Sequence, residues 1–412
     1  MRVILAGVVL AVVWAALWSP CLMDDAFIAY SYGRDAAAYT VEGYTSAAWV
    51  ALAAIAHRVD LHPLVMARCV SALLVFALAY ALRRTPCVAA AVLASPGVWL
   101  HSAMGLETTA YASVCAALWL WLTRCDPEPI RVGLALVGLA LLRPEGVAVG
   151  AAVLLVQAMR GNPCARAAAV ALAVGGAYFV ARWWYWGALL PTPFHMKAGG
   201  MTLATYVTGA KHWQSLWLLA AWAWWASHRC VFAVAIGVSM LAPYLFVAPI
   251  MGWAGRFMFP LALLLLVSMA AAPRRLRVAL LAVVVLTAPM NAYRWWWIRD
   301  QGRKLMQCHG AIAARLDGGE VWAADAGVIS YYGRARLRDV GGLMSPKPTT
   351  AEGCRWVVIN TRDVLGAGLE RTGERVRYRV PPQWDERAWR LVMWRRYHSV
   401  HGCELWQKKE EH

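Results

Sequence analysis

The sequence predicts a mainly helical membrane protein that ends in a small α/β domain. Three observations support this class. The chain has 412 residues, of which 61% are hydrophobic and only 15% charged, whereas a soluble domain carries about 25% charged residues. Apolar runs separated by short Arg-rich or Pro/Gly-rich breaks recur from Val3 to about Asn291, and polar residues become frequent afterwards. We therefore divide the chain into a polytopic membrane domain, 1–292, and a polar domain, 293–412.

Eleven apolar segments are predicted to cross the membrane. Several are shorter than the about 20 residues that a crossing needs, so we expect these to be tilted, broken or longer than their hydropathy indicates. The predicted spans are about 3–19, 64–82, 87–100, 107–123, 130–142, 146–159, 165–185, 213–226, 230–249, 257–272 and 275–292. The first run has the general form of a signal peptide, but "LWSPC" lacks a small-x-small cleavage site, so we expect an uncleaved span.

The positive charges decide the status of one further apolar piece, 44–56. Cytoplasmic loops carry more Lys and Arg than outer loops. If Arg2 is cytoplasmic and 44–56 lies at the outer surface, nearly all arginine-bearing loops fall on the cytoplasmic side. If 44–56 is instead a twelfth span, nearly all of these loops fall on the outer side. These loops contain Arg83-Arg84, Arg124 and Arg131, Arg160 and Arg166, Arg229, and Arg274 with Arg275 and Arg277. The polar domain is then expected on the outer side.

Much of the net charge of +17 lies in these short loops, which makes it a signal of orientation. No basic and aromatic platform for single-stranded nucleic acid stands out, so we expect no nucleic-acid partner. The ten cysteines form no CxxC pair and no Cys/His metal spacing. Cys308, Cys354 and Cys403 fall in the polar domain and could pair if that domain is outside, but the sequence does not fix a pairing.

The polar motifs between the spans all fall on the outer side in this topology. Ionisable residues at membrane depth are costly and by default indicate a functional site. Six such motifs on one face predict a shared cleft. They are Asp24-Asp25, "VEGYTS" at 41–46, "HSAMGLE" at 101–107, "RPEG" at 143–146, "PTPFHMK" at 191–197 and "GWAGRF" at 252–257.

Asp24 and Asp25 directly follow the first span, at the start of a segment that we expect to lie on the membrane surface as a short amphipathic helix. One Asp could cap this helix by accepting hydrogen bonds from its free N–H groups. Neighbouring helical residues point about 100° apart, so the other could face the cleft. A carboxylate there could act as a general base toward a hydroxyl, with Asp24 favoured, or hold a divalent cation.

The basic residues of the outer face are candidates for binding a phosphate. We assign this role to Lys197, Arg256, Arg143 and His195. The alternative is that these side chains reach the lipid headgroups, which is less typical on the outer side. An acceptor or a sugar is expected at Glu42, Tyr44, Glu107 and Glu145. For Glu107 and Glu145, a favourable interaction with a helix dipole is an equal alternative.

Several motifs resemble those of GT-C-type membrane glycosyltransferases. They are "DDAFIAYSYGRD…VEGYTSAAWV", "GLETTAY", "LRPEG", "LPTPFHMKA" and "GRFMFP". The resemblance is strongest to the terminal β-(1→2) arabinofuranosyltransferases of mycobacterial cell-wall synthesis and their wider bacterial family. It implies a GT-C-type helical bundle, an extracytoplasmic active site in the first outer loop, a polyprenyl-phosphate sugar donor and inversion at the anomeric carbon. By motif position, it places the catalytic acidic pair on Asp24 and Asp25 and the basic loop residue on Lys197.

The sequence therefore predicts an inner-membrane glycosyltransferase with an extracytoplasmic active site and C-terminus. It would move a sugar, which the resemblance suggests is arabinofuranose, to a glycan or lipid acceptor. The residues identify no definite cofactor, and a divalent cation could take part. A non-catalytic membrane protein of envelope or flagellar assembly is the main alternative, and it predicts a dispensable Asp pair. A transporter is a weaker alternative, because the sequence shows no internal repeat.

The orientation gives the first testable prediction. A phosphatase fused after His412 should be active, because the arginine-bearing loops place this end outside the cytoplasm. Green fluorescent protein fused at the same point should remain dark if it is exported through the general secretory route. A bright fluorescent fusion with an inactive phosphatase fusion would contradict the predicted topology.

Overall fold

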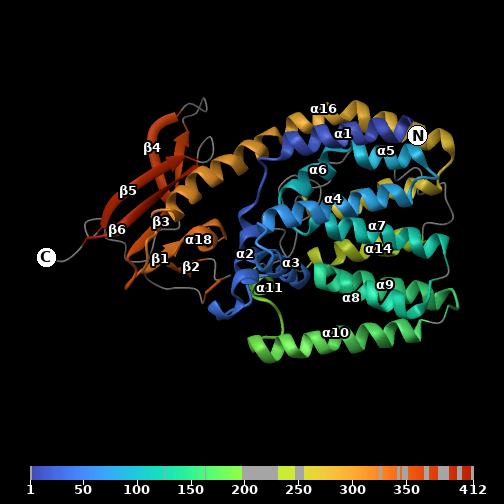
Figure 1. Cartoon of the computed structure of the whole chain (residues 1–412), viewed down its shortest axis with the longest axis horizontal. Helices are drawn as coiled ribbons and strands as arrows, with labels where there is room; N and C mark the ends of the chain where they lie inside the picture. The colour runs from blue at the N-terminus through green and yellow to red at the C-terminus, as the bar shows by residue number, and fades with distance from the viewer. Residues whose placement is uncertain are drawn as a thin grey trace.

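The structure is a computed structural model. It describes residues 2–125, 127–162, 164–196, 231–245, 255–323, 327–340, 344–345, 351–365, 371–378, 389–396 and 401–409. The described chain is mainly helical, with a small sheet at one end (Figure 1). This arrangement confirms the predicted coarse class.

The helices lie over the segments predicted as spans. Their bounds are α1 (Arg2–Trp18), α4 (Pro63–Ala81), α5 (Pro86–Ala94), α6 (Pro96–Ala103), α7 (Thr108–Arg124), α8 (Pro129–Leu142), α9 (Glu145–Met159), α10 (Ala165–Trp186), α14 (Val231–Leu241), α15 (Phe259–Ser268) and α16 (Arg274–Leu305). Shorter helices are α2 (Asp24–Arg34), α3 (Ala47–Arg58) and α11 (Thr192–Met196). Proline begins α4, α5, α6 and α8, where its missing N–H costs no hydrogen bond. The predicted span 213–226 lies outside the described residues.

Three helical stretches in the described residues are long and apolar enough to cross a membrane. They are Pro63–Ala81, Ala165–Trp186 and Arg274–Ala313, and the bent pair α5–α6 would make a fourth span. Shorter apolar helices are Arg2–Trp18, Ala47–Arg58, Pro129–Leu142, Glu145–Met159 and Phe259–Ala271. These helices indicate membrane association. That the chain crosses the membrane eleven times stays a prediction.

The segment predicted as one span at 87–100 is two helices bent by 49°. The bend lies at Ser95, whose ψ of 116° is extended rather than helical. Pro96 causes this break, because its ring excludes the helical conformation of the preceding residue and it has no N–H to donate.

Close packing of α1 on α5 shows how the bundle is held together. A side chain at Gly7 would come within 3.0 Å of the Ala90 backbone, so glycine permits the approach of the two helices. Trp14 donates a hydrogen bond of 2.9 Å from Nε1 to the carbonyl of Ala94, where the break after α5 leaves that oxygen accessible. These contacts belong to one hydrophobic core that also includes residues of α7, α15 and α16.

The two ends of the bundle differ in charge, as the positive-inside assignment requires. The basic connections follow α4, α7 and α9 and precede α10 and α16, at the end of the bundle that carries the N-terminus (Figure 1). The starts of α2, α7 and α9, which carry Asp24, Glu107 and Glu145, lie at the opposite end of the bundle, toward the sheet (Figure 1).

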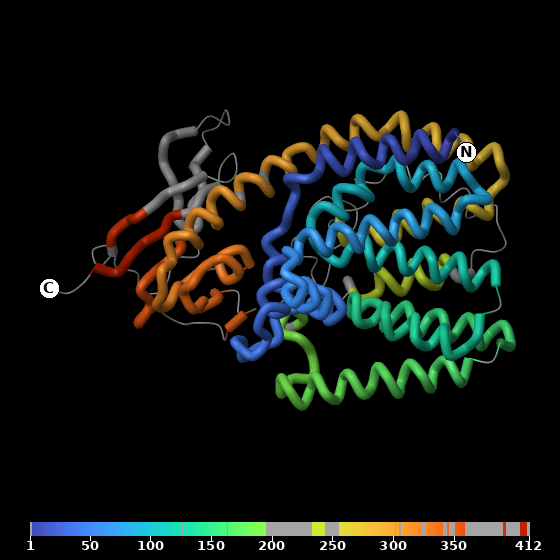
Figure 2. Tube along the Cα trace, viewed as in Figure 1, coloured from blue at the N-terminus to red at the C-terminus, as the bar shows by residue number. Residues whose placement is uncertain are grey.

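Helix α16 connects the bundle directly to the C-terminal domain (Figure 2). Its 32 residues continue past the change of composition near Asn291. The expected domain boundary at 292/293 therefore falls inside a helix, and Trp295 and Ile298 beyond it still belong to the core of the bundle. Pro289 is accommodated within this helix.

The C-terminal domain contains a mixed sheet and short helices. In its described part the strand order is β2-β1-β3-β6-β5, and β4 pairs with β3. Strand β1 pairs in parallel with β2 on one side and with β3 on the other, whereas the pairs β3–β4, β3–β6 and β5–β6 are antiparallel. The strands are β1 (Glu320–Ala323), β2 (Arg336–Asp339), β3 (Trp356–Leu365), β4 (Arg371–Tyr378), β5 (Trp389–Arg396) and β6 (His401–Lys408), and the helices are α17 (Ala311–Ala313) and α18 (Gly327–Tyr332). Cys308 is disulfide-bonded, while Cys354 is a free thiol.

Candidate functional site

Helix α2 lies between the bundle and the C-terminal domain, and its residues Ala26–Tyr32 are all buried. It packs against α3 on one side and α18 on the other (Figure 1). The expectation that this segment lies on the membrane surface is therefore wrong. Its polar groups explain the difference, because Ser31 forms a hydrogen bond of 3.0 Å with Ser330 and Arg34 donates to the carbonyl of Tyr331.

Two neighbouring loops fix the position of α2. Tyr30 donates through its hydroxyl to the carbonyl of Gly105 at 2.6 Å, and Trp49 donates from Nε1 to the same oxygen at 2.8 Å. Gly105 has a φ of +79°, and a side chain there would come within 2.6 Å of the Tyr30 hydroxyl. Arg68 donates to the carbonyls of Cys21 and Ala103, which secures the loop before α2. The start of α2 is thus held rigidly at the mouth of the bundle.

Asp24 caps a helix of the other domain. Its Oδ2 accepts a hydrogen bond of 2.9 Å from the N–H of Gly327, and its Oδ1 accepts one of 2.8 Å from Val328. These are the first two residues of α18, whose N-terminus carries partial positive charge. The contact is so close that a side chain at position 327 would lie 1.9 Å from the Asp24 carbonyl oxygen. The N-cap of α2 itself is Met23, which has no side-chain capping bond.

Asp25 forms an ion pair with Arg256, which precedes α15. Nη2 of Arg256 lies 3.3 Å from Oδ2 of Asp25, and the Asp25 side chain is 23% exposed. The Arg256 side chain is only 8% exposed. Its Nε and Nη1 are buried without a hydrogen-bond partner within the described part of the chain. An unpaired buried donor costs about 1–3 kcal/mol, and a charged one costs more, so this guanidinium is suited to receive an anion.

Arg143 is paired with two carboxylates. Its Nη2 lies 2.8 Å from Oε1 of Glu145, and its Nη1 lies 3.4 Å from Oε1 of Glu107. All three side chains are largely buried. The Phe257 ring connects this cluster to the Asp25 pair, because its centre lies 5.5 Å from Cζ of Arg143 and 4.9 Å from Cζ of Arg256. The two guanidinium groups therefore share one aromatic neighbour but differ in how fully their charge is compensated.

Glu42 forms a second buried ion pair, with Arg182 near the end of α10. Oε2 of Glu42 lies 2.6 Å from Nη2 of Arg182, and both side chains are almost fully buried. Burial raises the pKa of Glu42 above its ordinary value, and the Arg182 guanidinium opposes this shift. Arg182 also donates to the carbonyl of Leu189, and the carbonyl of Glu42 accepts from the N–H of Thr192. This pair thereby joins the loop before α3 to the segment after α10.

Tyr44 belongs to an aromatic cluster beside this pair. Its ring centre lies 5.0 Å from that of Tyr32 and 6.4 Å from that of Trp186, both in edge-to-face geometry. Tyr32 fixes the loop by donating to the carbonyl of Val41 and accepting from the N–H of Gly43. The cluster gives the loop before α3 a defined shape next to the candidate site.

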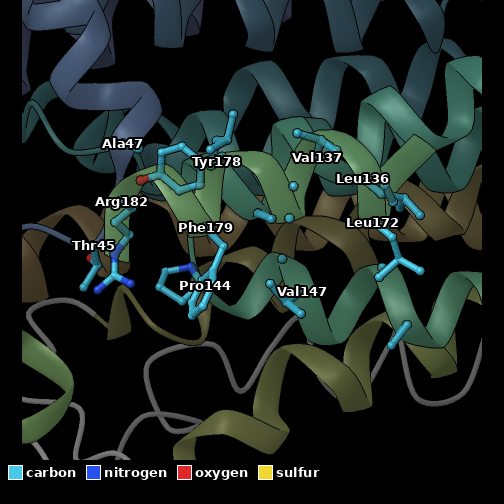
Figure 3. A pocket seen from close by; sticks show the side chains of 18 of the residues that line it. Thr45, Ala47, Leu136, Val137, Pro144, Val147, Leu172, Tyr178, Phe179 and Arg182 are labelled. Carbon is cyan, nitrogen blue, oxygen red and sulfur yellow. The ribbon is translucent and has the colours of Figure 1, made fainter. Parts of the chain in front are cut away.

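An apolar groove of about 660 Å³ runs between α8, α9 and α10. Thr45, Arg182 and Pro144 lie toward one end of the groove, and Leu136 and Leu172 lie toward the other (Figure 3). Pro144 lies between the two members of the Arg143–Glu145 pair in sequence. The groove therefore opens beside the charged cluster.

The structure brings most of the predicted site residues to one end of the bundle. Asp24, Asp25 and Arg256 form one group, Arg143, Glu107 and Glu145 a second, and Glu42 and Tyr44 a third. Lys197 lies outside the described residues, and His195 lies in α11 with its side chain not described. No group of three or more His, Cys, Asp or Glu side chains in the described ranges could hold a metal ion. The roles given to all these residues stay predictions.

Two residues that contact the predicted site residues were not themselves predicted from the sequence. Arg182 is a charged residue inside a predicted span, and such a residue is itself a signal of a functional or structural site. Gly327 lies 303 residues from Asp24, and no local pattern indicates that the two meet. The sequence could therefore have identified the first partner but not the second.

No protein-family model matches the chain, and neither a curated protein nor a solved structure is detectably similar to it. The resemblance to membrane glycosyltransferases therefore stays a prediction based on short motifs.

The contact between Asp24 and α18 predicts a role in stability. Asp24→Ala should remove the acceptor of two backbone N–H groups and weaken the docking of α18 by about 1–3 kcal/mol. Hydrogen exchange of the peptide that contains Gly327 and Val328 should become faster, and Gly327→Val should have the same effect through steric conflict. Asp35→Ala, at an exposed position at the end of α2, is the matched control. Unchanged exchange in both test variants would contradict this role.

The buried pair of Glu42 and Arg182 predicts a non-additive effect on stability. Arg182→Met should destabilise the protein by about 3–5 kcal/mol, because it leaves the Glu42 carboxylate buried without its cation. The double variant with Glu42→Gln should recover much of this loss. Thermal unfolding in detergent measures both effects. A double variant as unstable as the sum of its single variants would show that the two residues act independently.

Proposed function

We propose that the protein transfers a sugar from a polyprenyl-phosphate donor to an extracytoplasmic glycan or lipid acceptor, with inversion at the anomeric carbon. The sugar class proposed from the motif resemblance is arabinofuranose. The active site would lie where α2 meets the start of α15, around Asp25 and Arg256. A divalent cation could assist, as the sequence allows.

The pairing of Asp25 with Arg256 is the observation that carries the proposal. Nη2 of Arg256 is directed to Oδ2 of Asp25, which leaves Oδ1 of the carboxylate for a hydroxyl group. The buried Nε and Nη1 of Arg256 remain for an anion. A general base beside a preorganised cation is the minimum that transfer from a sugar phosphate requires.

The proposed reaction needs one proton acceptor and one anion site. The Asp25 carboxylate takes the proton from the acceptor hydroxyl as its oxygen forms a bond to the anomeric carbon. The bond between that carbon and the phosphate oxygen breaks, and polyprenyl phosphate leaves with the electron pair. Arg256 stabilises the negative charge that develops on the departing phosphate.

The contacts of the two Asp residues favour other roles than the sequence predicts. The sequence favours Asp24 as the general base and Asp25 as its partner. Both oxygens of Asp24 accept backbone hydrogen bonds from α18, whereas Asp25 keeps a partly exposed carboxylate. We therefore propose Asp25 as the base and Asp24 as the residue that positions it and the C-terminal domain.

The remaining residues would shape the site. Glu107 and Glu145 compensate the charge of Arg143, so Arg143 is proposed to orient a phosphate or sugar at longer range than Arg256. Lys197 is proposed as a second phosphate ligand, together with His195. Glu42 and Tyr44 form the wall on the acceptor side.

Two observations support an outward-facing site. The basic connections lie at the end of the bundle opposite to the candidate site (Figure 1), as expected if they are cytoplasmic. Cys308 in the C-terminal domain is disulfide-bonded, and such bonds persist mainly in oxidising compartments outside the cytoplasm.

Transfer in a purified system tests the proposal. Wild-type protein in nanodiscs should transfer arabinofuranose from synthetic polyprenyl-phosphoryl arabinofuranose to an oligosaccharide acceptor, with products detected by mass spectrometry. Asp25→Asn should reduce the kcat of the folded protein by about 10²–10⁴-fold, as expected for loss of a general base. Its melting temperature should also fall, because Arg256 is left buried without its carboxylate. Arg256→Lys should raise the KM for the donor, because it loses the guanidinium fork.

Asp35→Asn, an exposed carboxylate at the other end of α2, is the matched control and should retain wild-type transfer. Rates close to wild type in Asp25→Asn and in Asp24→Asn would contradict an acidic active site on α2. That result would favour the alternative of a non-catalytic protein of envelope assembly.

A further inference from the structure

Helix α16 carries a band of exposed aromatic side chains between its apolar part and the C-terminal domain. Tyr293, Trp296 and Trp297 are 83%, 43% and 45% exposed, while Trp295 between them is buried in the core. Exposed rings of this size are costly in water and are typical of the headgroup layer of a membrane, which suits their amphipathic character. The band therefore marks where lipid headgroups would contact the helix.

The distance along α16 from its basic start to this band matches the thickness of one membrane. The tryptophans at 295–297 follow the arginines in 274–277 by about 20 residues, which is about 30 Å at the helical rise per residue. The hydrocarbon core of a bilayer is also about 30 Å thick. Helix α10 has the same spacing, because Trp186 at its end follows Arg166 by about 20 residues. Two helices that are apolar enough to cross a membrane thus agree on the position of this headgroup layer.

Arg299 lies one helical turn beyond the exposed Trp296. Its Cζ lies 4.5 Å from the centre of the Trp296 ring, which is within the range of a cation–π interaction. The side chain is half-buried. Among the described residues its Nε has no hydrogen-bond partner, and no carboxylate is paired with the guanidinium. This group therefore keeps its charge and its fork of N–H donors for an anion.

The surface that presents Arg299 is rigid. Gly302, three residues further along α16, packs against the loop before α2, because a side chain there would lie 2.8 Å from the backbone nitrogen of Leu22. The Trp296 ring packs against Trp18, the last residue of α1, with ring centres 6.2 Å apart. A cation on such a surface is already in position, so less entropy is lost when a ligand binds.

The charges around Arg299 also favour an anion. The neighbouring carboxylate, Asp300, is held by Arg303 at 3.1 Å and by Lys304 at 2.5 Å. This part of α16 thus carries three cations and one carboxylate. The anion that a bilayer supplies in its headgroup layer is the phosphate diester of a phospholipid, whose oxygens match a guanidinium fork.

We propose that Arg299, stacked on Trp296, binds the phosphate of a phospholipid in the leaflet on the side of the candidate site. The glycerol and the upper part of the chains would lie against the aromatic band of α16. This lipid is a bound partner of the bundle surface and takes no part in the proposed sugar transfer. The proposal therefore stands or falls independently of the proposed function.

Two matched pairs of variants on α16 provide the test. Arg299→Gln removes the unpaired cation, whereas Arg303→Gln removes a cation that is already paired with Asp300. Trp296→Leu removes the ring beneath Arg299, whereas Trp297→Leu removes a ring of similar exposure. Native mass spectrometry of the full-length protein would measure the affinity of the first bound dioleoyl phosphatidylglycerol, with dioleoylglycerol as the same lipid without its phosphate.

Wild-type protein should bind the phospholipid at least 10-fold more tightly than dioleoylglycerol. Arg299→Gln and Trp296→Leu should lose this preference, and Arg303→Gln and Trp297→Leu should keep it. Equal affinity of the two lipids for wild-type protein would overturn the proposal, because the aromatic band alone would then explain binding. An unchanged preference in Arg299→Gln would overturn it, as would displacement of the phospholipid by millimolar inorganic phosphate, which would indicate a site for the free anion.

A second measurement needs no variant and so does not depend on whether the variants fold. Phosphatidylethanolamine with a diazirine on its headgroup, incorporated into nanodiscs with the wild-type protein, should label the peptide that contains Trp296 and Arg299 on illumination. Labelling confined to other peptides would contradict the proposal.

Discussion

The burial of α2 is the constraint on which the arrangement of the candidate site depends. This helix begins with two carboxylates but is enclosed from Ala26 to Tyr32, so every polar group on it must find a partner inside the protein. Those partners come from opposite directions. Gly105 belongs to the helical bundle, and Ser330 belongs to the C-terminal domain. The helix can occupy this place only when both parts of the molecule are present, which makes the site a property of the whole chain.

Charge compensation varies across the polar end of the bundle. Arg143 meets two carboxylates and Arg182 meets one at short distance, so neither carries a free charge. Arg256 meets a single carboxylate through one of its nitrogens. Fully compensated pairs hold the scaffold in place, since removing either member leaves a buried charge. An incompletely compensated cation in the same setting keeps electrostatic attraction for an anion, and this is the physical basis for proposing Arg256 as a binding group.

Much of the fold could be predicted because its signals are local. Apolar runs that begin with Pro63, Pro86 or Pro129 gave helices at nearly the predicted bounds. Pro96 also signals the break between α5 and α6 locally, but the apolar run 87–100 predicts one continuous span. Contacts between residues far apart in the sequence could not be predicted in the same way. The capping of α18 by Asp24 joins residues 303 positions apart, and an isolated Asp pair after an apolar run is equally compatible with a local cap. The residues of the site could be selected, but their partners required the tertiary structure.

The length of helix α16 bears on how far the C-terminal domain lies from the membrane. Its 32 residues extend about 48 Å, whereas the hydrocarbon core of a bilayer is about 30 Å thick. If the helix enters the membrane at Arg274, roughly a third of its length stands beyond the apolar layer. The sheet is attached to that projecting end (Figure 2). The helix would then act as a fixed spacer that sets the height of the C-terminal domain above the lipid surface. The same height would set how far from the membrane an acceptor could be reached.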